Sequence, residues 1–504
     1  MSKNNNEKQQ EDTTTTIHDV NHHHLHLTHS QETDKNRTTN KFIYTPEEKK
    51  LVRKINFITV PFICFIAFLQ MLDKYTLNFS AVMGIFQDTG INGNQFAWLG
   101  SIYYLGYLIF QIPNQYLLPK IPISKYLGIA LILWGIVVGC TALATNFIQL
   151  CILRFLLGLF ESVTYPALYL LIAILWRRTE QVMFFGTIPI SNALGGAFAG
   201  LISLGFLKLN GLSGLSSWKW CMIILGSITI IAGIFTFLFL PDKAKSKWYR
   251  LSLQETIIVQ ERIRDNSVIQ TKEIKNEQII ESLKEPRFYC YILITFFINL
   301  TNGCLTTFST IIIKSMGFSD TVSILLNIPT NFIPMLIVII TVYFSRYQSK
   351  QNTCIGAILC FITFMALIFL SVLPLNASML LGMFFVSIAP TMMILYALIS
   401  NNITGYTKRV FYNGSSMVAY CIGNFIGPLL IRQEEAPRYR SGLIIYIITM
   451  FISILLFFYI RWTLIRDNIY RQQLKMENKL PPPIENRDEM DVTDRYDLHF
   501  LYRP

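Results

Sequence analysis

The chain has 504 residues, of which 52% are hydrophobic and only 15% are charged. Soluble globular domains carry about 25% charged residues, so this composition excludes that class. The net charge of +12 is distributed over alternate loops rather than gathered in one patch, so we expect no nucleic-acid partner. The nine cysteines all fall in apolar stretches and form no CxxC motif, and we therefore expect neither a metal site nor a cofactor.

The chain begins with a polar segment and continues with long apolar blocks. Residues 1–50 are rich in Asn, Gln and Thr, which predicts a disordered N-terminal tail. Each later block has the length of about 20 residues that an α-helix needs to cross a bilayer. The blocks lie at roughly 56–78, 95–117, 126–145, 147–174, 182–207, 218–240, 288–311, 322–344, 353–373, 378–400, 411–431 and 441–463. The sequence thus predicts an all-α membrane protein with twelve transmembrane helices in two six-helix bundles, at 51–240 and 288–466.

Residues 241–287 separate the two predicted bundles. This connector opens with the basic and aromatic sequence LPDKAKSKWYR, which suits an anionic inner membrane surface. Ser252 and Glu255 fit a capping box and predict a short helix at about 252–265. After the last block, residues 467–504 contain a Pro-Pro-Pro run and mixed charges, and we expect a disordered tail there.

The distribution of Lys and Arg predicts the orientation of the helices. The 1–2, 3–4 and 9–10 connections contain neither residue, whereas the alternate connections do. By the positive-inside rule the basic connections are cytosolic, so both termini are predicted to be cytosolic. The basic residues concerned, outside the connector, are Lys120, Lys125, Arg177, Arg178, Arg346, Lys350, Lys408 and Arg409.

Charged residues within the apolar blocks indicate a functional cavity. The fourth block contains Arg154 and Glu161, which are seven residues apart and so face one side of a helix at a separation of ~10 Å. The first block contains Asp73 and Lys74 near its outer end, at a depth that matches that of Arg154. Because ionisable groups in a bilayer usually face a bundle interior or a water-filled cavity, we expect these four residues to line one cavity.

The chemistry of these four groups suggests coupled binding of an anion and a proton. Lys74 and Arg154 would attract an anionic substrate. Desolvation favours the protonated form of a carboxyl group such as Glu161. Protonation would remove a negative charge that repels the anion, so proton and anion would favour each other's binding. We therefore assign proton coupling to Asp73 and Glu161. Two alternatives stay open: Asp73 and Arg154 could form a plain ion pair, and Lys74 could extend to the lipid headgroups.

Neutral polar residues provide further candidates for substrate contact. Tyr103, Tyr107 and Gln111 lie four residues apart and share one face of the second predicted helix, and Asn299 and Asn302 lie in the seventh. Tyr107, Gln111, Asn299 and Asn302 are included in the predicted substrate site. For each of them, a role in packing helices together is the alternative.

The region 50–470 resembles the major facilitator superfamily, and more closely the anion:cation symporter family in its fungal allantoate-permease branch. The resemblance rests on LDKYTLNFSAVMGI (72–85), RFLLGLFESVTYPALY (154–169), LPDKAKSKWYRLSLQE (240–255), SNNITGYTKR (400–409), GNFIGP (423–428) and APRYRSG (436–442). In such carriers the acidic and basic residues that match Asp73, Lys74, Arg154 and Glu161 serve substrate binding and proton coupling. Two departures are Ser345, where Asp is common, and Lys74, where many relatives have Arg.

The resemblance implies proton-coupled uptake of a small organic anion by alternating access. The substrates of the family include allantoate, ureidosuccinate, carboxylate vitamins and dipeptides. We further expect a monomer in the plasma membrane. A nutrient sensor that binds but does not transport is the alternative, because it would keep the same binding residues. We do not expect an enzyme, since no nucleophile–base arrangement is present.

Overall fold

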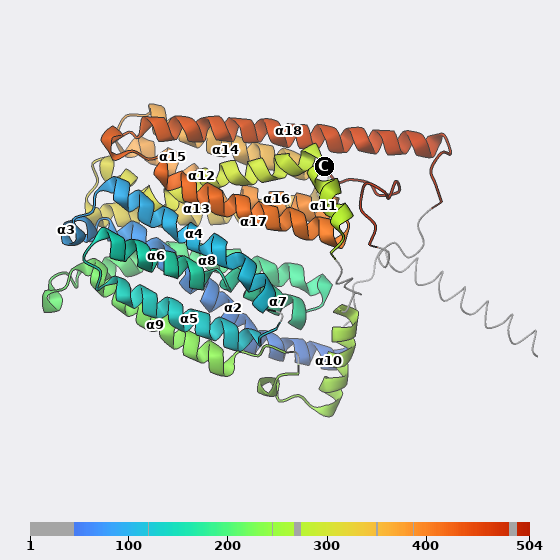
Figure 1. Ribbon diagram of the computed structural model, residues 1–504, viewed down its shortest axis with the longest axis horizontal. Coiled ribbons are helices and arrows are strands. Elements are labelled where there is room, and N and C mark those ends of the chain that lie inside the picture. The colour runs from blue at the N-terminus through green and yellow to red at the C-terminus, as the bar shows by residue number, and fades with distance from the viewer. Residues whose placement is uncertain are drawn as a thin grey trace, which may run out of the picture. The chain divides into compact units, whose positions relative to one another are not determined.

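The computed structural model describes residues 45–118, 120–243, 245–266, 274–348, 351–386, 388–482 and 491–504. The predicted disordered N-terminal tail, apart from its last six residues, lies outside these ranges. By their contacts, Met1–Lys54 and Ile55–Pro504 are separate units, and the packing described below is that within Ile55–Pro504. Over the described ranges the secondary structure is helical, without strands (Figure 1).

The helices before the connector form the N-terminal half. Their strongest pairings are α5 with α9 and α4 with α6. The predicted block 147–174 is two helices, because the chain leaves the α-helical path for two residues after Glu161. The bounds are α2 (Pro46–Ser80), α3 (Ile85–Thr89), α4 (Gly93–Leu117), α5 (Ile123–Thr141), α6 (Phe147–Glu161), α7 (Thr164–Leu175), α8 (Arg178–Leu207) and α9 (Ser217–Phe239).

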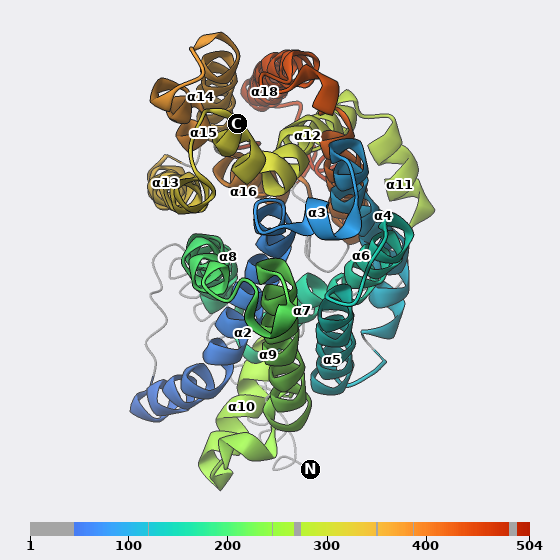
Figure 2. The same cartoon turned by 90° about the vertical axis from the view of Figure 1, so that its left-hand side faces the viewer.

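The helices after the connector form the C-terminal half. Here α12 pairs with α17 and α14 with α18. Figure 2 shows α12–α16 and α18 grouped on one side and α5, α6, α8 and α9 on the other. The bounds are α12 (Pro286–Ser315), α13 (Asp320–Tyr347), α14 (Asn352–Val372), α15 (Leu380–Phe385), α16 (Ala389–Asn402), α17 (Tyr406–Leu429) and α18 (Arg440–Met476).

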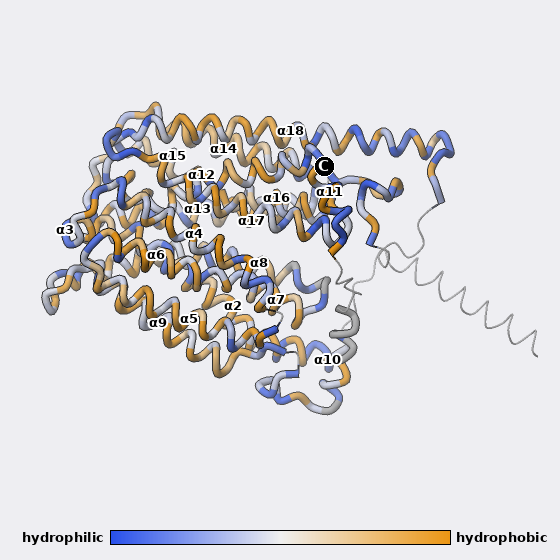
Figure 3. The backbone as a smooth tube through the Cα atoms, viewed as in Figure 1, coloured by the Kyte–Doolittle hydropathy of each residue, from blue (hydrophilic) through white to orange (hydrophobic). Residues whose placement is uncertain are grey.

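The apolar blocks of the sequence coincide with these long helices. Within the described residues, ten spans are long and apolar enough to cross a membrane. The predicted blocks at 95–117 and 411–431 correspond to α4 and α17, which are 25 and 24 residues long. They are less apolar because both carry Tyr and Asn, together with Gln in α4 and Ser in α17. Hydrophobic colour dominates the long helices in Figure 3. We call the ends that carry Asn78 and Gly93 outer and those that carry Arg177 and Lys408 inner, following the predicted orientation.

The described residues of the connector form two α-helices rather than the single one expected. α10 (Leu253–Asn266) begins with a capping box in which Glu255 Oε2 accepts from Ser252 N at 2.8 Å and Ser252 Oγ accepts from Glu255 N at 3.2 Å. α11 (Asn276–Leu283) gave no signal in the sequence analysis. It is short, and it packs against α17. Its buried residues are polar: Gln278, Glu281 and Ser282.

The expectation of a disordered C-terminal tail is wrong for its described parts. α18 continues to Met476, and residues 491–504 make specific hydrogen bonds with the inner end of the C-terminal half. The sequence could not show this, because a polar segment without periodicity becomes ordered only through partners that tertiary structure supplies.

Two glycines allow α4 and α6 to approach closely. A Cβ atom built on Gly158 would overlap Tyr103 O, and one built on Gly106 would overlap Phe155 O. Helices with small residues at their crossing bring their backbones together in this way. This contact matters for the site, because it places the face of α6 that carries Arg154 and Glu161 against the tyrosines of α4.

We predict that Gly158→Ala destabilises the protein by about 1–3 kcal/mol, because the methyl group forces the two backbones apart. The measurement is the thermal unfolding midpoint of the purified protein in detergent. Gly139→Ala in α5 is the matched control, since a Cβ there meets nothing within 4 Å and alanine favours the helix. Equal midpoints for the two variants would contradict the role given to this crossing.

Candidate functional site

Arg154 and Glu161 lie on one face of α6, as their spacing predicts. Both are buried, with exposed fractions of 5% and 1%. Neither carboxylate oxygen of Glu161 has a hydrogen-bond partner among the described residues, and Arg154 Nε has none either. Gln70 and Tyr103 lie close enough to Glu161 to act on its charge. A buried carboxyl group without fixed partners has room to exchange a proton or to meet a ligand.

Asp73 is equally buried, at 1% exposure, and contacts α9. Its Oδ2 atom accepts a hydrogen bond of 3.1 Å from Thr229 Oγ1 of α9, and Oδ1 has no partner among the described residues. Asp73 therefore forms no hydrogen-bonded pair with Arg154, although the two interact through their charges. The plain ion pair considered as an alternative is not formed in this conformation.

Lys74 is surrounded by tyrosines rather than by carboxylates. Its Nζ atom lies 4.9 Å from the ring centroid of Tyr104 and 5.9 Å from that of Tyr103. It also donates a hydrogen bond of 3.4 Å to the hydroxyl of Tyr420 on α17. The side chain thus points into the protein between the two halves, and not toward lipid headgroups as the alternative for Lys74 would require.

The structure places the four predicted charges within electrostatic reach of one another. Asp73 interacts with Arg154 and Glu161, and Glu161 also interacts with Lys74. Two cations and two carboxylates give a formal charge of zero. The low dielectric of the protein interior strengthens such interactions compared with water, so adding a proton or an anion to this group changes its energy strongly.

The neutral candidates divide into two sets. The hydroxyl of Tyr107 and Oε1 of Gln111 are buried and lack a partner among the described residues, so both are available to a ligand. Asn299 and Asn302, by contrast, are engaged with Asn424 of α17. Asn424 Nδ2 donates to Asn299 Oδ1 at 3.0 Å, and Asn302 Nδ2 donates to Asn424 Oδ1 at 2.8 Å. These bonds favour a packing role for the asparagines in this conformation.

Sequence reasoning missed several neighbours of the charges. Gln70 precedes Asp73 by one helical turn and could have been found from that spacing. Thr229 and Tyr104 come from other helices, and Thr229 gave no signal, because a threonine in an apolar block usually bonds within its own helix. Tyr165 of α7 also acts on Lys74 and accepts a hydrogen bond of 2.8 Å from Asn192 Nδ2.

Polar contacts join the two halves on the outer side of these charges. Asn78 of α2 donates to Ser309 Oγ at 2.5 Å and accepts from Thr310 N at 3.0 Å, both on α12. One turn earlier in α2, the hydroxyl of Tyr75 donates to Asn331 Oδ1 of α13 at 2.6 Å. Gly100 of α4 packs directly against Thr307. We call the group of Asn78, Ser309 and Thr310 the outer knot.

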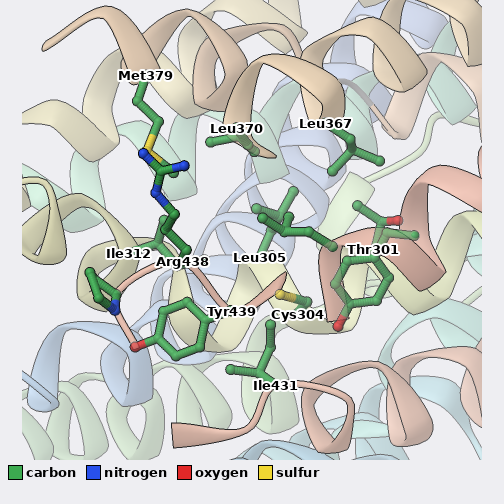
Figure 4. A pocket seen from close by; sticks show the side chains of 13 residues that line it. Thr301, Cys304, Leu305, Ile312, Leu367, Leu370, Met379, Ile431, Arg438 and Tyr439 are labelled. Carbon is green, nitrogen blue, oxygen red and sulfur yellow. The ribbon is translucent and has the colours of Figure 1, made fainter. Parts of the chain in front are cut away.

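A separate, mainly apolar pocket lies within the outer part of the C-terminal half (Figure 4). None of the eight predicted site residues lines it. It therefore does not change the assignment of the site. Its lining includes Thr301, Cys304, Leu367, Leu370, Arg438 and Tyr439.

Comparison with known proteins agrees with this fold. Residues 63–428 match the Major Facilitator Superfamily. The chain is 30% identical over 479 residues to a protein of Saccharomyces cerevisiae named allantoate permease, covering 91% of this chain and 87% of that one. It is 32% identical over 461 residues to the thiamine pathway transporter THI73 of the same yeast, covering 90% and 86%.

A solved structure supports the fold. A bacterial homologue of the lysosomal transporter Spinster, in an inward-facing and unoccupied conformation, superposes with a TM-score of 0.60 at 14% identity, covering 84% of this chain and 98% of that one. The chain therefore belongs to the Major Facilitator Superfamily, in the branch that includes the yeast allantoate permease. The family consists of membrane transporters that carry small molecules.

We predict that Asn78→Ala lowers the stability of the closed outer side, because Ser309 and Thr310 N lose their buried partner at a cost of about 1–3 kcal/mol. A lower thermal midpoint in detergent is the expected result. Asn413→Ala provides the control, since Asn413 is exposed on α17. A midpoint for Asn78→Ala equal to that of the control would show that the outer knot does not hold the halves together.

Proposed function

We propose that this protein is a secondary active transporter that couples proton entry to the uptake of a small organic anion by alternating access. The observation that carries the proposal is the group of four charges from α2 and α6, of which Lys74 is half-buried and the other three are buried. Glu161 lacks fixed partners in this group, and Lys74 lacks a carboxylate of its own. Family membership supports transport in general. The proposals of proton coupling and of an anionic substrate rest on the four charges.

The substrate anion fits beside Lys74 and Arg154. An ammonium group that is half-buried among tyrosines and lacks a carboxylate partner is costly, and a substrate carboxylate would supply the missing charge. When no substrate is bound, the faces of the Tyr103 and Tyr104 rings stabilise the Lys74 cation. The free polar atoms of Tyr107 and Gln111, one and two turns further along α4, would bond the rest of the substrate. Asn299 and Asn302 could join only after releasing Asn424.

The proton acts through Glu161 with Asp73 as its electrostatic partner. With both carboxylates ionised the four charges sum to zero, and an incoming anion meets two negative neighbours. A proton on Glu161 leaves a net positive charge that the anion then neutralises. Proton and anion binding therefore favour each other, and linkage makes this coupling reciprocal.

The outer knot and the contact of Gly100 with Thr307 support an inward-facing assignment for this conformation. Turnover would then require these contacts to open as the inner ends close. We propose that residues 51–240 and 288–466 are the two moving bodies and 241–287 the cytosolic connector between them. We place both termini in the cytosol and the protein in the plasma membrane as a monomer.

The direct test is uptake into cells that express the protein. Radiolabelled allantoate, nicotinate, pantothenate and a dipeptide would be supplied separately at pH 5 and pH 7.5. We expect accumulation of at least one of them, faster at pH 5 and abolished by a protonophore. If none of these compounds is taken up but one of them binds to the purified protein, the nutrient sensor would be favoured instead.

We predict that Glu161→Gln removes the acceleration of uptake at pH 5 and reduces the accumulation ratio to about 1, because the amide cannot release a proton. Exchange of labelled for unlabelled substrate should persist, since the amide mimics the protonated carboxyl. Glu434→Gln, at an exposed carboxylate, is the control. Normal pH-driven accumulation by Glu161→Gln would exclude this residue from coupling.

We predict that Arg154→Ala raises the apparent KM for the transported anion by roughly tenfold to a hundredfold, the value of one or two charge-assisted hydrogen bonds. Competition by unlabelled substrate measures the change. Arg432→Ala, at an exposed arginine, should leave KM unaltered. An unchanged KM for Arg154→Ala would remove this residue from the binding site.

A further inference from the structure

A second group of charges lies at the inner end of the C-terminal half, far along the helices from the proposed substrate site. Lys408, in the first turn of α17, is fully buried. Its Nζ atom donates to Glu281 Oε1 at 2.9 Å, Glu285 Oε1 at 2.5 Å and Asp494 Oδ1 at 2.9 Å. One buried ammonium group thus holds three carboxylates, an arrangement that requires all four side chains to stay in place.

The three carboxylates come from three different segments of the chain. Glu281 belongs to α11 of the connector, Glu285 directly precedes α12, and Asp494 belongs to the C-terminal segment. Each has a further bond: Thr493 Oγ1 donates to Glu281 Oε2 at 3.0 Å, and the hydroxyl of Tyr412 donates to Glu285 Oε2 at 2.7 Å. Lys408 therefore ties connector, helix and tail together at one point.

Two arginines and a tyrosine lie around Asp494. Arg471 of α18 donates to the carbonyl oxygen of Asp494 at 2.7 Å, and the hydroxyl of Tyr502 donates to Asp494 Oδ2 at 2.8 Å. The Arg287 guanidinium lies over the ring of Tyr502, 4.7 Å from its centroid. Burial, followed by the nearby charge of Asp494, raises the pKa of Tyr502 to about 12, so this hydroxyl stays a donor at cellular pH.

The rest of the C-terminal segment is also fixed to the inner ends. Arg503 N donates to Asn402 Oδ1 at the end of α16, and Tyr502 N donates to Asn468 Oδ1 of α18 at 2.9 Å. Gln278 Nε2 of α11 donates to Asp491 Oδ2 at 3.0 Å. The segment 491–504 thus contacts α11, α16 and α18 in addition to Lys408.

We propose that residues 491–504 act as a latch that clamps the inner ends of α11, α12, α16, α17 and α18 into one rigid body. Alternating access needs each half to move without deforming. The helices of one half are held along the membrane by packing, but their inner ends emerge into water, where packing alone is weaker. The buried charges supply the missing connection, and loss of Asp494 leaves the inner ends free to move separately.

Only the transport experiment on the latch rests on the proposed function. The first test therefore uses no substrate. Hydrogen–deuterium exchange of the full-length protein in detergent should show slow exchange for amides of 491–504, because Tyr502 N and Arg503 N donate to the side chains of Asn468 and Asn402. Asp494→Asn keeps the shape but removes the charge. We expect faster exchange in this variant in 491–504, in α11 and in the first turns of α17. Arg495→Gln, at an exposed neighbour, should match the wild type.

The second readout is uptake of radiolabelled allantoate per carrier molecule at the cell surface. We expect Asp494→Asn to reduce the maximal rate roughly fivefold, a change in barrier of about 1 kcal/mol, with KM unaltered. A purely structural role would reduce the amount of carrier but not the rate per molecule.

Several results would overturn the latch. These are rapid exchange of 491–504 in the wild type, faster exchange confined to 491–504 in Asp494→Asn, or an unaltered rate per carrier in that variant. Failure of the wild type to take up allantoate would bear on the proposed substrate class, and the exchange results would then decide the latch alone. If Asp494→Asn does not fold, Thr493→Val replaces it, because this variant removes the bond to Glu281. Slow exchange of 491–504 and α11 in the wild type that is lost in both segments in Thr493→Val would support the latch, and any other result would overturn it.

Discussion

The structure depends on how four ionisable groups are accommodated inside a bundle of apolar membrane-spanning helices. Asp73, Lys74, Arg154 and Glu161 balance one another in number, and each is held by a different environment. Because burying an unpaired charge costs several kcal/mol, the surrounding helices must keep the positions that hold these groups near one another. The glycine crossing of α4 and α6 and the hydrogen bond from Thr229 to Asp73 help to fix those positions. A group balanced in this way responds strongly to one added proton or anion.

The two ends of the molecule use different chemistry for the contacts that hold them. The outer knot consists of neutral amide and hydroxyl groups, which lose only about 1 kcal/mol net per hydrogen bond when water replaces the partner. Such a contact can open and reform. The inner group around Lys408 consists of buried ions, whose separation is far more costly. All its members belong to the connector, the C-terminal half or the C-terminal segment, so the movement that we propose for one half against the other need not break it.

Sequence reasoning found the fold and singled out the four charges of the proposed site for a physical reason. A bilayer imposes a length and an apolar composition on every spanning helix, so the blocks could be read directly. The same constraint makes residues such as Arg154 and Glu161 conspicuous, and their seven-residue spacing fixed them to one face. The neutral residues gave a weaker signal. Asn299 and Asn302 were expected to contact substrate, but they are bonded to Asn424, which only the packing of α12 on α17 could reveal.

By itself, the sequence determined the helical membrane-spanning class, the positions of the long helices and the capping box of α10, because these depend on local composition and spacing. The tertiary structure decided what lies around each charge: Thr229 beside Asp73, tyrosines around Lys74 and free oxygens on Glu161. It also decided that the C-terminal segment is ordered. Asp494 lies 86 residues from Lys408 in the chain, and no local pattern records a contact between residues so far apart.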